Sequence, residues 1–121
     1  MKIIVSATGK TLDSQLDLKF GRANIFILID TATMDFEALD NTGAMASGGA
    51  GISATQMVID KGATAVLTGN MGPNAMKVLE AANFEIYKGS ANSIKENIEQ
   101  LNKGLLEKIS TTVAAHSGMR K

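Results

Sequence analysis

Two glycine-rich segments and one arginine are the residues of this sequence best suited to hold an anion. The segments span residues 48–51 and 69–72, and each leads into a stretch with helical spacing of apolar residues. Backbone N–H groups at a helix N-terminus, with a dipole equivalent to about half a positive charge, favour an anion, and glycine lets it come close to the backbone. Arg22 offers a forked guanidinium for the same anion. The structural alternatives are turns that require a positive φ in residues 48–51 and a surface ion pair of Arg22 with Asp13 or Asp17.

Two methionines lie in or beside the glycine-rich segments. Met45 and Met71 carry soft thioether sulfurs, which suit copper or a sulfide-rich ligand better than magnesium. Met57 and Met76 lie in helical stretches, where methionine serves as core filler. Met45 and Met71 are therefore candidate metal ligands, with core packing as the alternative.

The composition excludes several other kinds of site. The 121 residues include no cysteine, which removes disulfides, thiolate-ligated clusters and cysteine nucleophiles, and the single histidine, His116, rules out a multi-histidine metal site within one chain. Twelve basic and twelve acidic residues give zero net charge, which speaks against nucleic acid as a partner. Neither GxxxxGK(S/T) nor a GxGxxG after a strand occurs, so a nucleotide pocket has little support.

The sequence also argues against an enzyme. Serine catalysis needs a base, and the one histidine lies near the C-terminus. Two-metal nucleases need clustered carboxylates, one of them on the first strand, but residues 2–7 read KIIVSA. We therefore expect a non-catalytic protein.

Charged residues are almost absent from the middle of the chain. Between Asn41 and Met76 only Asp60 and Lys61 carry charge, although this window holds both glycine-rich segments. Polar residues interrupt it, so it does not read as a membrane span. The window is expected to pack around something uncharged, or around something whose charge is met by backbone groups, with a small-residue core as the alternative.

The pattern predicts five strands and three helices. Strands are expected at residues 2–7, 24–30, 36–41, 63–68 and 84–88, and helices at 52–61, 73–83 and from 94 onward. Gly62 is placed to end the first helix, Pro73 to begin the second, and Ser93 with Glu96 to form a capping box for the third. The apolar faces of the last two helices are expected at Ala75, Val78, Leu79 and Ala82, and at Ile94, Ile98, Leu101 and Leu105.

This order of elements predicts a five-stranded mixed sheet with strand order 3-2-1-4-5, which resembles the ribonuclease-H-like topology. Residues 1–109 are expected to form one domain and residues 110–121 a flexible tail. No stretch reaches the ~20 apolar residues of a membrane span and the first residues do not resemble a signal peptide, so a cytoplasmic protein is expected. Strand polarity brings three loops to one sheet edge, where open α/β sheets bind ligands. The candidate binding residues there are Arg22, Gly48, Gly49, Ala50, Gly51, Asn70, Met71, Gly72 and Asn74.

Three segments resemble the dinitrogenase iron-molybdenum cofactor biosynthesis family. They are FGRANIFILID at residues 20–30, GGAGISATQMV at 48–58 and TGNMGPNAMKVLEAANFEIYKG at 68–89, and the resemblance extends to about Leu105. The family includes nitrogenase cofactor carriers, the C-terminal part of a cofactor-assembly enzyme and small stand-alone proteins of the orange-protein type, which hold a molybdenum-containing sulfide cluster. The resemblance implies a ribonuclease-H-like fold without nuclease activity that binds an anionic metal–sulfide cluster at the loop edge.

The chain departs from many relatives in one place. Gly48 precedes the GAG segment where many members have histidine, and no cysteine is available to ligate iron. The resemblance then implies non-covalent capture of a finished cluster containing molybdenum with copper or iron, as in the orange-protein type, and a protein recipient as the possible partner. The alternative hypothesis is a regulatory or interaction module that binds a small anion or a protein at the same edge. Neither hypothesis calls for nucleic acid or a membrane.

Overall fold

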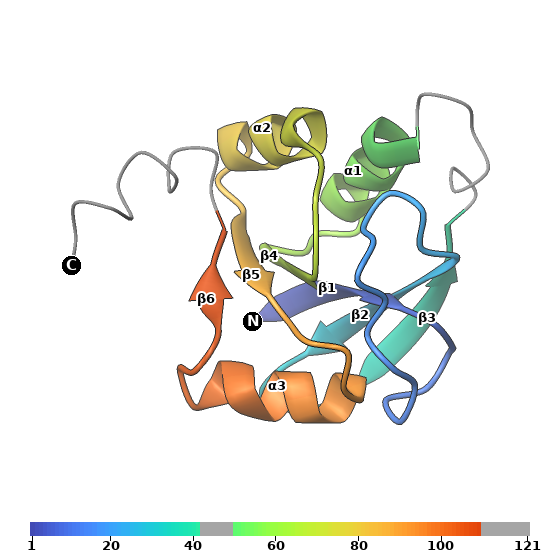
Figure 1. The fold of residues 1–121 in the computed structure, drawn as a ribbon, viewed down its shortest axis with the longest axis vertical. Helices are drawn as coiled ribbons and strands as arrows, with labels where there is room; N and C mark the ends of the chain where they lie inside the picture. Colours follow the sequence, from blue (N-terminus) through green and yellow to red (C-terminus); the bar gives the residue numbers. More distant parts are fainter. Residues whose placement is uncertain (42–49, 110–121) are drawn as a thin grey trace.

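Six strands form one mixed sheet with helices on both of its faces (Figure 1). The structure is a computed structural model that describes residues 1–41 and 50–109, with backbone only for residues 50–54. The predicted tail at 110–121 therefore lies outside the described residues. The elements in chain order are β1 (Lys2–Ala7), β2 (Ile25–Asp30), β3 (Phe36–Asp40), α1 (Ala50–Asp60), β4 (Ala65–Thr68), α2 (Pro73–Ala81), β5 (Glu85–Lys88), α3 (Ile94–Asn102) and β6 (Glu107–Lys108).

Strand β1 lies inside the sheet, whose order is β3-β2-β1-β4-β5-β6. It pairs antiparallel with β2 on one side and parallel with β4 on the other. β3 extends the sheet antiparallel to β2, and β5 extends it parallel to β4. The parallel neighbours β4 and β5 need a crossover connection, which α2 supplies.

The predicted count of five strands was wrong, because β6 adds a sixth. Its two residues pair antiparallel with the end of β5, after Gly104 reverses the chain behind α3 with a φ of 74°. A salt bridge of 3.1 Å between Lys108 Nζ and Glu85 Oε2 ties the two strands together. A strand of two exposed residues has no alternation of apolar and polar positions, so periodicity gives no signal for it.

Helices α1 and α2 cover one face of the sheet and α3 covers the other (Figure 1). Alternate residues of β1 serve the two layers: Ile4 packs in the cluster with α1 and α2, whereas Ile3 and Val5 pack in the cluster with α3. β1 and β4 are buried on both faces, which explains their unbroken runs of small and apolar residues. None of the described helices is long and apolar enough to cross a bilayer.

Three predicted helix boundaries are confirmed. Gly62 follows α1 with a φ of 78°, and Pro73 is the first residue of α2. Ser93 Oγ accepts the Glu96 N–H at 3.1 Å and so caps α3. Helix α1 begins at Ala50, earlier than predicted, which puts two of the candidate residues into its first turn.

Three positions predicted on the apolar helix faces were wrong. Ala82 is exposed, because α2 ends at Ala81 and Ala82 is only its C-cap. Leu105 lies beyond the end of α3, because the helix stops before Gly104, and it is 68% exposed. Val78 is 41% exposed, because α2 is rotated so that Met76 faces the sheet beside Ala75 and Leu79. A short helix buries one narrow stripe, and neighbouring apolar positions compete for it.

Candidate anion-binding site

The candidate site lies at the edge of the sheet where β1 and β4 end and β2 begins. The register pairs Ala7 with Ile25 and Ile25 with Asp40, so the turn before β2 and the residues after β3 meet there. The loop after β4, which leads into α2, leaves the same edge. The polarity argument from the sequence thus agrees with the observed arrangement of these segments.

The connection between β1 and β2 crosses this edge as an ordered strap, residues 16–20. The Asp17 N–H donates to Ser6 O at 2.9 Å, on the side of β1 that faces β4. The Asn70 N–H donates to Leu18 O at 2.6 Å, and the Phe20 N–H donates to Asn70 O at 3.2 Å. The strap therefore fills the space between the ends of β1 and β4 with backbone, and a ligand at this edge must sit outside it.

Gly69 permits this close approach. A Cβ on Gly69 would stand 2.8 Å from Leu18 Cα and 2.5 Å from Leu18 Cδ2, closer than atoms pack. The glycine is therefore needed for contact with the strap. Gly72 differs: its φ is −67° and nothing lies within 4 Å of a Cβ built on it.

Two buried hydroxyl groups support the strap from below. Ser6 Oγ donates to Asp17 O at 2.6 Å and lies 2.7 Å from Thr68 Oγ1. Because the Ser6 hydrogen is directed at Asp17, Thr68 is the donor in the second bond. Both residues have no exposed surface. Their hydrogen bonds hold the strap to β1 and β4, a role that the sequence pattern did not reveal.

Arg22 lies on the turn between the strap and β2 with its side chain exposed. Phe20, before it, is buried and packs against Phe26 with ring centroids 5.3 Å apart, and Ala23, after it, has no exposed surface. Within the described part of the chain Arg22 makes no ion pair, and the expected alternative partners Asp13 and Asp17 do not contact it as salt bridges. Its guanidinium is thus exposed to solvent on a turn that is anchored by the buried Phe20 and Ala23.

Asn41 fastens that turn to the end of β3, and the sequence analysis did not single it out as a site residue. Its Nδ2 donates to Gly21 O at 3.1 Å and to Ala23 O at 2.7 Å, and its backbone N–H donates to Asn24 O at 2.9 Å. The side chain is 7% exposed. A buried asparagine in an uncharged stretch was the available signal.

The N-terminus of α2 faces the same edge with open donors. Gly72 is its N-cap and no side chain caps it. The first intrahelical bond runs from the Met76 N–H to Gly72 O at 3.1 Å, and Pro73 has no N–H. The N–H groups of Asn74 and Ala75 therefore come before the first helical bond, in the position that favours an anion.

The remaining candidate residues divide between described and undescribed parts of the chain. Asn70 and Asn74 are exposed. Met71 is half-buried and packs against the core beneath α1 and α2, which agrees with the alternative interpretation that it is a packing residue. Ala50 and Gly51 belong to the first turn of α1. Three candidates, Met45, Gly48 and Gly49, lie outside the described residues.

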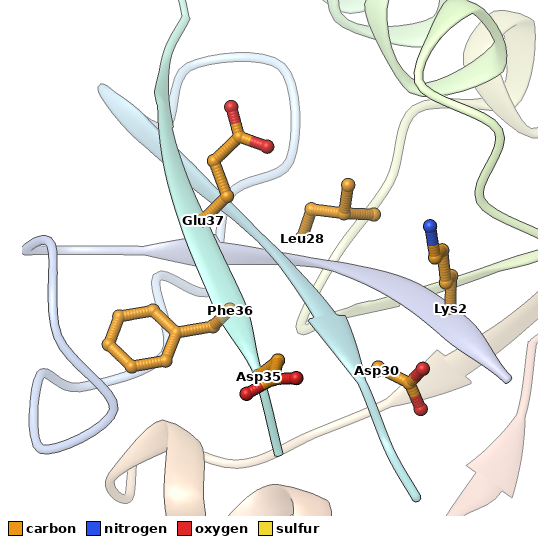
Figure 2. A pocket seen from close by; sticks show the side chains of 6 residues that line it. All are labelled: Lys2, Leu28, Asp30, Asp35, Phe36 and Glu37. Atoms are coloured by element: carbon orange, nitrogen blue, oxygen red, sulfur yellow. The ribbon is translucent and has the colours of Figure 1, made fainter. Parts of the chain in front are cut away.

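A hollow of about 310 Å³ lies at the opposite edge of the sheet, which the sequence analysis did not predict (Figure 2). Figure 2 shows Lys2, Leu28 and Glu37 projecting to one side while Phe36 turns away from them. The Asp30 carboxylate there accepts the Ala32 N–H at 3.0 Å, and this bond lowers the pKa of Asp30. In the described ranges no three acidic or histidine side chains are grouped to hold a metal ion. The hollow therefore lacks an assembled metal site.

Comparison with known proteins places the chain in a family. The family model of the dinitrogenase iron-molybdenum cofactor matches residues 1–104. Among solved structures, the apo form of the orange protein from Desulfovibrio gigas is 34% identical with a TM-score of 0.85 over 89% of this chain and 92% of that one. A candidate NifB protein from Thermotoga is 32% identical with a TM-score of 0.79 over 91% and 94%. An uncharacterised protein of Methanocaldococcus jannaschii is 27% identical over 79% of this chain and 84% of its own length. The chain belongs to the dinitrogenase iron-molybdenum cofactor family.

Proposed function

We propose that this protein carries an anionic molybdenum-containing metal–sulfide cluster, with copper or iron as the second metal, bound non-covalently at the Arg22 edge of the sheet. The observation behind the proposal is that an exposed Arg22, free of ion pairs in the described ranges, and the open N-terminus of α2 lie at the same edge of the sheet, joined through the Phe20–Asn70 bond. The family description names an iron-molybdenum cofactor, and the similar orange protein is described as an apo form. Both support a carrier of such a cofactor.

The chemistry of the residues suits a finished cluster. A thiometallate already carries its sulfide ligands, so it needs charge neutralisation and N–H donors rather than protein thiolates, and the chain has no cysteine. Arg22 would supply the charge, and the N–H groups of Asn74 and Ala75 would supply donors. The first glycine-rich segment would add further backbone donors from Gly48, Gly49, Ala50 and Gly51. The thioether sulfur of Met45 or Met71 would supply a soft contact to the cluster.

We further propose that the protein is non-catalytic and cytoplasmic and that its sheet is of the ribonuclease-H-like type. The buried hydroxyls nearest the edge, on Ser6 and Thr68, are committed to holding the strap. Neither nucleic acid nor membrane is needed as a partner, and the cluster would pass to a recipient protein.

Reconstitution tests the proposal directly. Apoprotein is incubated with tetrathiomolybdate and either copper or iron, then separated by gel filtration, and we expect a coloured protein peak that contains molybdenum. Arg22→Ala should retain about a tenth or less of the affinity, because hydrogen bonds to charged groups contribute about 1.5–3 kcal/mol. Its melting temperature should stay near that of wild type, since the side chain is exposed.

Lys103→Ala is the matched control, because it removes one exposed positive charge at the C-cap of α3. Its loading should equal that of wild type. A wild-type peak without colour or molybdenum would refute the carrier function. A large drop in melting temperature for Arg22→Ala would instead make Arg22 a structural residue.

A second candidate function is a regulatory or interaction module. Leu18, on the strap beside Asn70, is 40% exposed, and an apolar side chain at this edge suits contact with a protein. Calorimetry with nucleotides and phosphorylated metabolites separates the candidates. Micromolar affinity for one of them, without thiometallate binding, would favour the module.

A further inference from the structure

The Arg22 side chain is carried by the turn at residues 20–23, and only a long backbone hydrogen bond closes this turn internally. The bond within this turn runs from the Ala23 N–H to Phe20 O at 3.4 Å, at the long limit for a hydrogen bond. Arg22 itself is exposed and has no ion pair in the described part of the chain that would fix its side chain. The turn therefore needs support from outside if it is to present the guanidinium in one place.

Asn41 supplies that support from the end of β3. Two side-chain bonds and one backbone bond of Asn41 reach the carbonyl groups of Gly21, Ala23 and Asn24, which bracket Arg22 in sequence. A primary amide has two hydrogens on one nitrogen, so it can serve two carbonyls at once, whereas a hydroxyl has one. Asn41 is only 7% exposed, so water cannot readily replace the Nδ2 hydrogens that a substitution of Asn41 would remove.

The other end of the turn is held independently. Phe20 is fixed by its N–H bond to Asn70 O and by packing on Phe26. Without the Asn41 side chain the chain would thus stay anchored at Phe20 and at the buried Ala23, while the carbonyl groups of Gly21 and Ala23, on either side of Arg22, would lose their donor. The effect of Asn41 is therefore expected to be confined to the segment that carries the guanidinium.

We infer that Asn41 is the positioning residue for anion capture: it holds the Arg22 turn in one orientation at the sheet edge that also carries the α2 N-terminus, without itself touching the ligand. This inference rests on the proposed function, because it assigns a role within the same site. It predicts that any effect of Asn41 on binding disappears when Arg22 is absent.

A double-mutant cycle with tetrathiomolybdate as the probe tests this role. We expect Asn41→Ser to weaken binding about threefold to tenfold, the equivalent of one hydrogen bond, in the wild-type background and to have no effect in the Arg22→Ala background. Asn24→Ser is the matched control, because Asn24 is exposed on the same turn and its side chain makes no hydrogen bond in the described part of the chain. Equal losses in both backgrounds, or no loss in either, would overturn the inference.

Measurements without ligand keep the inference separate from the proposed function. Backbone 15N relaxation should show a lower order parameter at Arg22 in Asn41→Ser than in wild type or Asn24→Ser, and an unchanged value would overturn the inference. In wild-type protein the Nδ2 hydrogens of Asn41 should exchange with solvent more slowly than those of Asn24, a comparison that needs no variant to fold. Equal exchange contradicts the inference, whereas wild-type protein that binds no thiometallate contradicts the proposed function alone.

Discussion

At the scale of single residues, uncharged polar side chains hold the backbone of the candidate site in place. Arg22 is the only charged candidate, but Ser6, Thr68 and Asn41 fix the backbone around it through buried hydrogen bonds. Buried polar groups are costly unless they are paired, and no described buried side-chain nitrogen or oxygen lacks a partner. The backbone around the candidate site is therefore held by satisfied buried hydrogen bonds, while Arg22 itself stays exposed to solvent.

Gly69 provides a residue-scale prediction. Gly69→Ala should lower the free energy of unfolding by about 1–3 kcal/mol, because the new Cβ would overlap the Leu18 backbone and force the strap away from Asn70. Gly72→Ala is the matched control: it adds the same methyl group into open space at a φ of −67°, so it should cost only the preference of the α2 N-cap for glycine over alanine and less than Gly69→Ala. Urea unfolding followed by circular dichroism measures both. Equal stability of the two variants would contradict the role given to Gly69.

At the scale of elements, the edge strand β6 is attached to β5 by a small polar cluster. Tyr87 donates its hydroxyl to Glu85 Oε1 at 2.7 Å, and Lys108 from β6 reaches the other carboxylate oxygen of Glu85 at 3.1 Å. The Tyr87 and Lys108 hydrogen bonds lower the pKa of Glu85. The part of β6 docking that depends on the ionised carboxylate is thus present above pH 4.5 and is lost as pH falls through the lowered pKa.

The single tyrosine of the chain makes this cluster measurable. Desolvation, followed by the hydrogen bond to Glu85, raises the pKa of Tyr87 from 10.0 to about 12, so the phenol stays protonated in the folded state and its stabilising effect is lost only as pH rises toward 12. Ultraviolet titration should give a midpoint near 12 for folded protein and near 10 for the chain in denaturant. Glu85→Gln should return the folded midpoint part of the way toward 10. A folded wild-type midpoint of 10 would show that the cluster does not form.

At the scale of the whole molecule, positive and negative charges cancel, and the candidate site occupies only one edge of the sheet. With zero net charge the protein has no net long-range attraction for an anion, so the proposed capture would depend on Arg22 and the α2 N-terminus at short range. The association rate of tetrathiomolybdate should therefore change by less than about threefold between low and high salt. Stopped-flow measurement over a salt series tests this, with Asn24→Lys as a variant whose added charge should raise the rate at low salt. A steep fall for wild type would contradict short-range capture.

Much of the fold was predictable because local rules decide it. The β-branched run of β1 predicted a strand, the small and apolar run of β4 predicted a strand buried on both faces, and Gly62, Pro73 and Ser93 marked helix ends. Each of these signals depends on residues a few positions apart. Val78 was misjudged because periodicity alone does not tell which of several apolar positions the sheet will cover, and Leu105 because the helix ends before Gly104. The two residues of β6 were too few to have any pattern.

The sequence by itself determined the family and the absence of thiol chemistry, because both follow from residue identities. It also determined that the Arg22 turn meets the second glycine-rich loop at one sheet edge, because this follows from the order and direction of the strands. Only the tertiary structure decided what fills that edge. The strap between β1 and β4, the Ser6–Thr68 pair and the Asn41 bonds join residues that are 11 to 62 positions apart. Such contacts depend on the register of distant segments in three dimensions, which no spacing of residue types along the chain encodes.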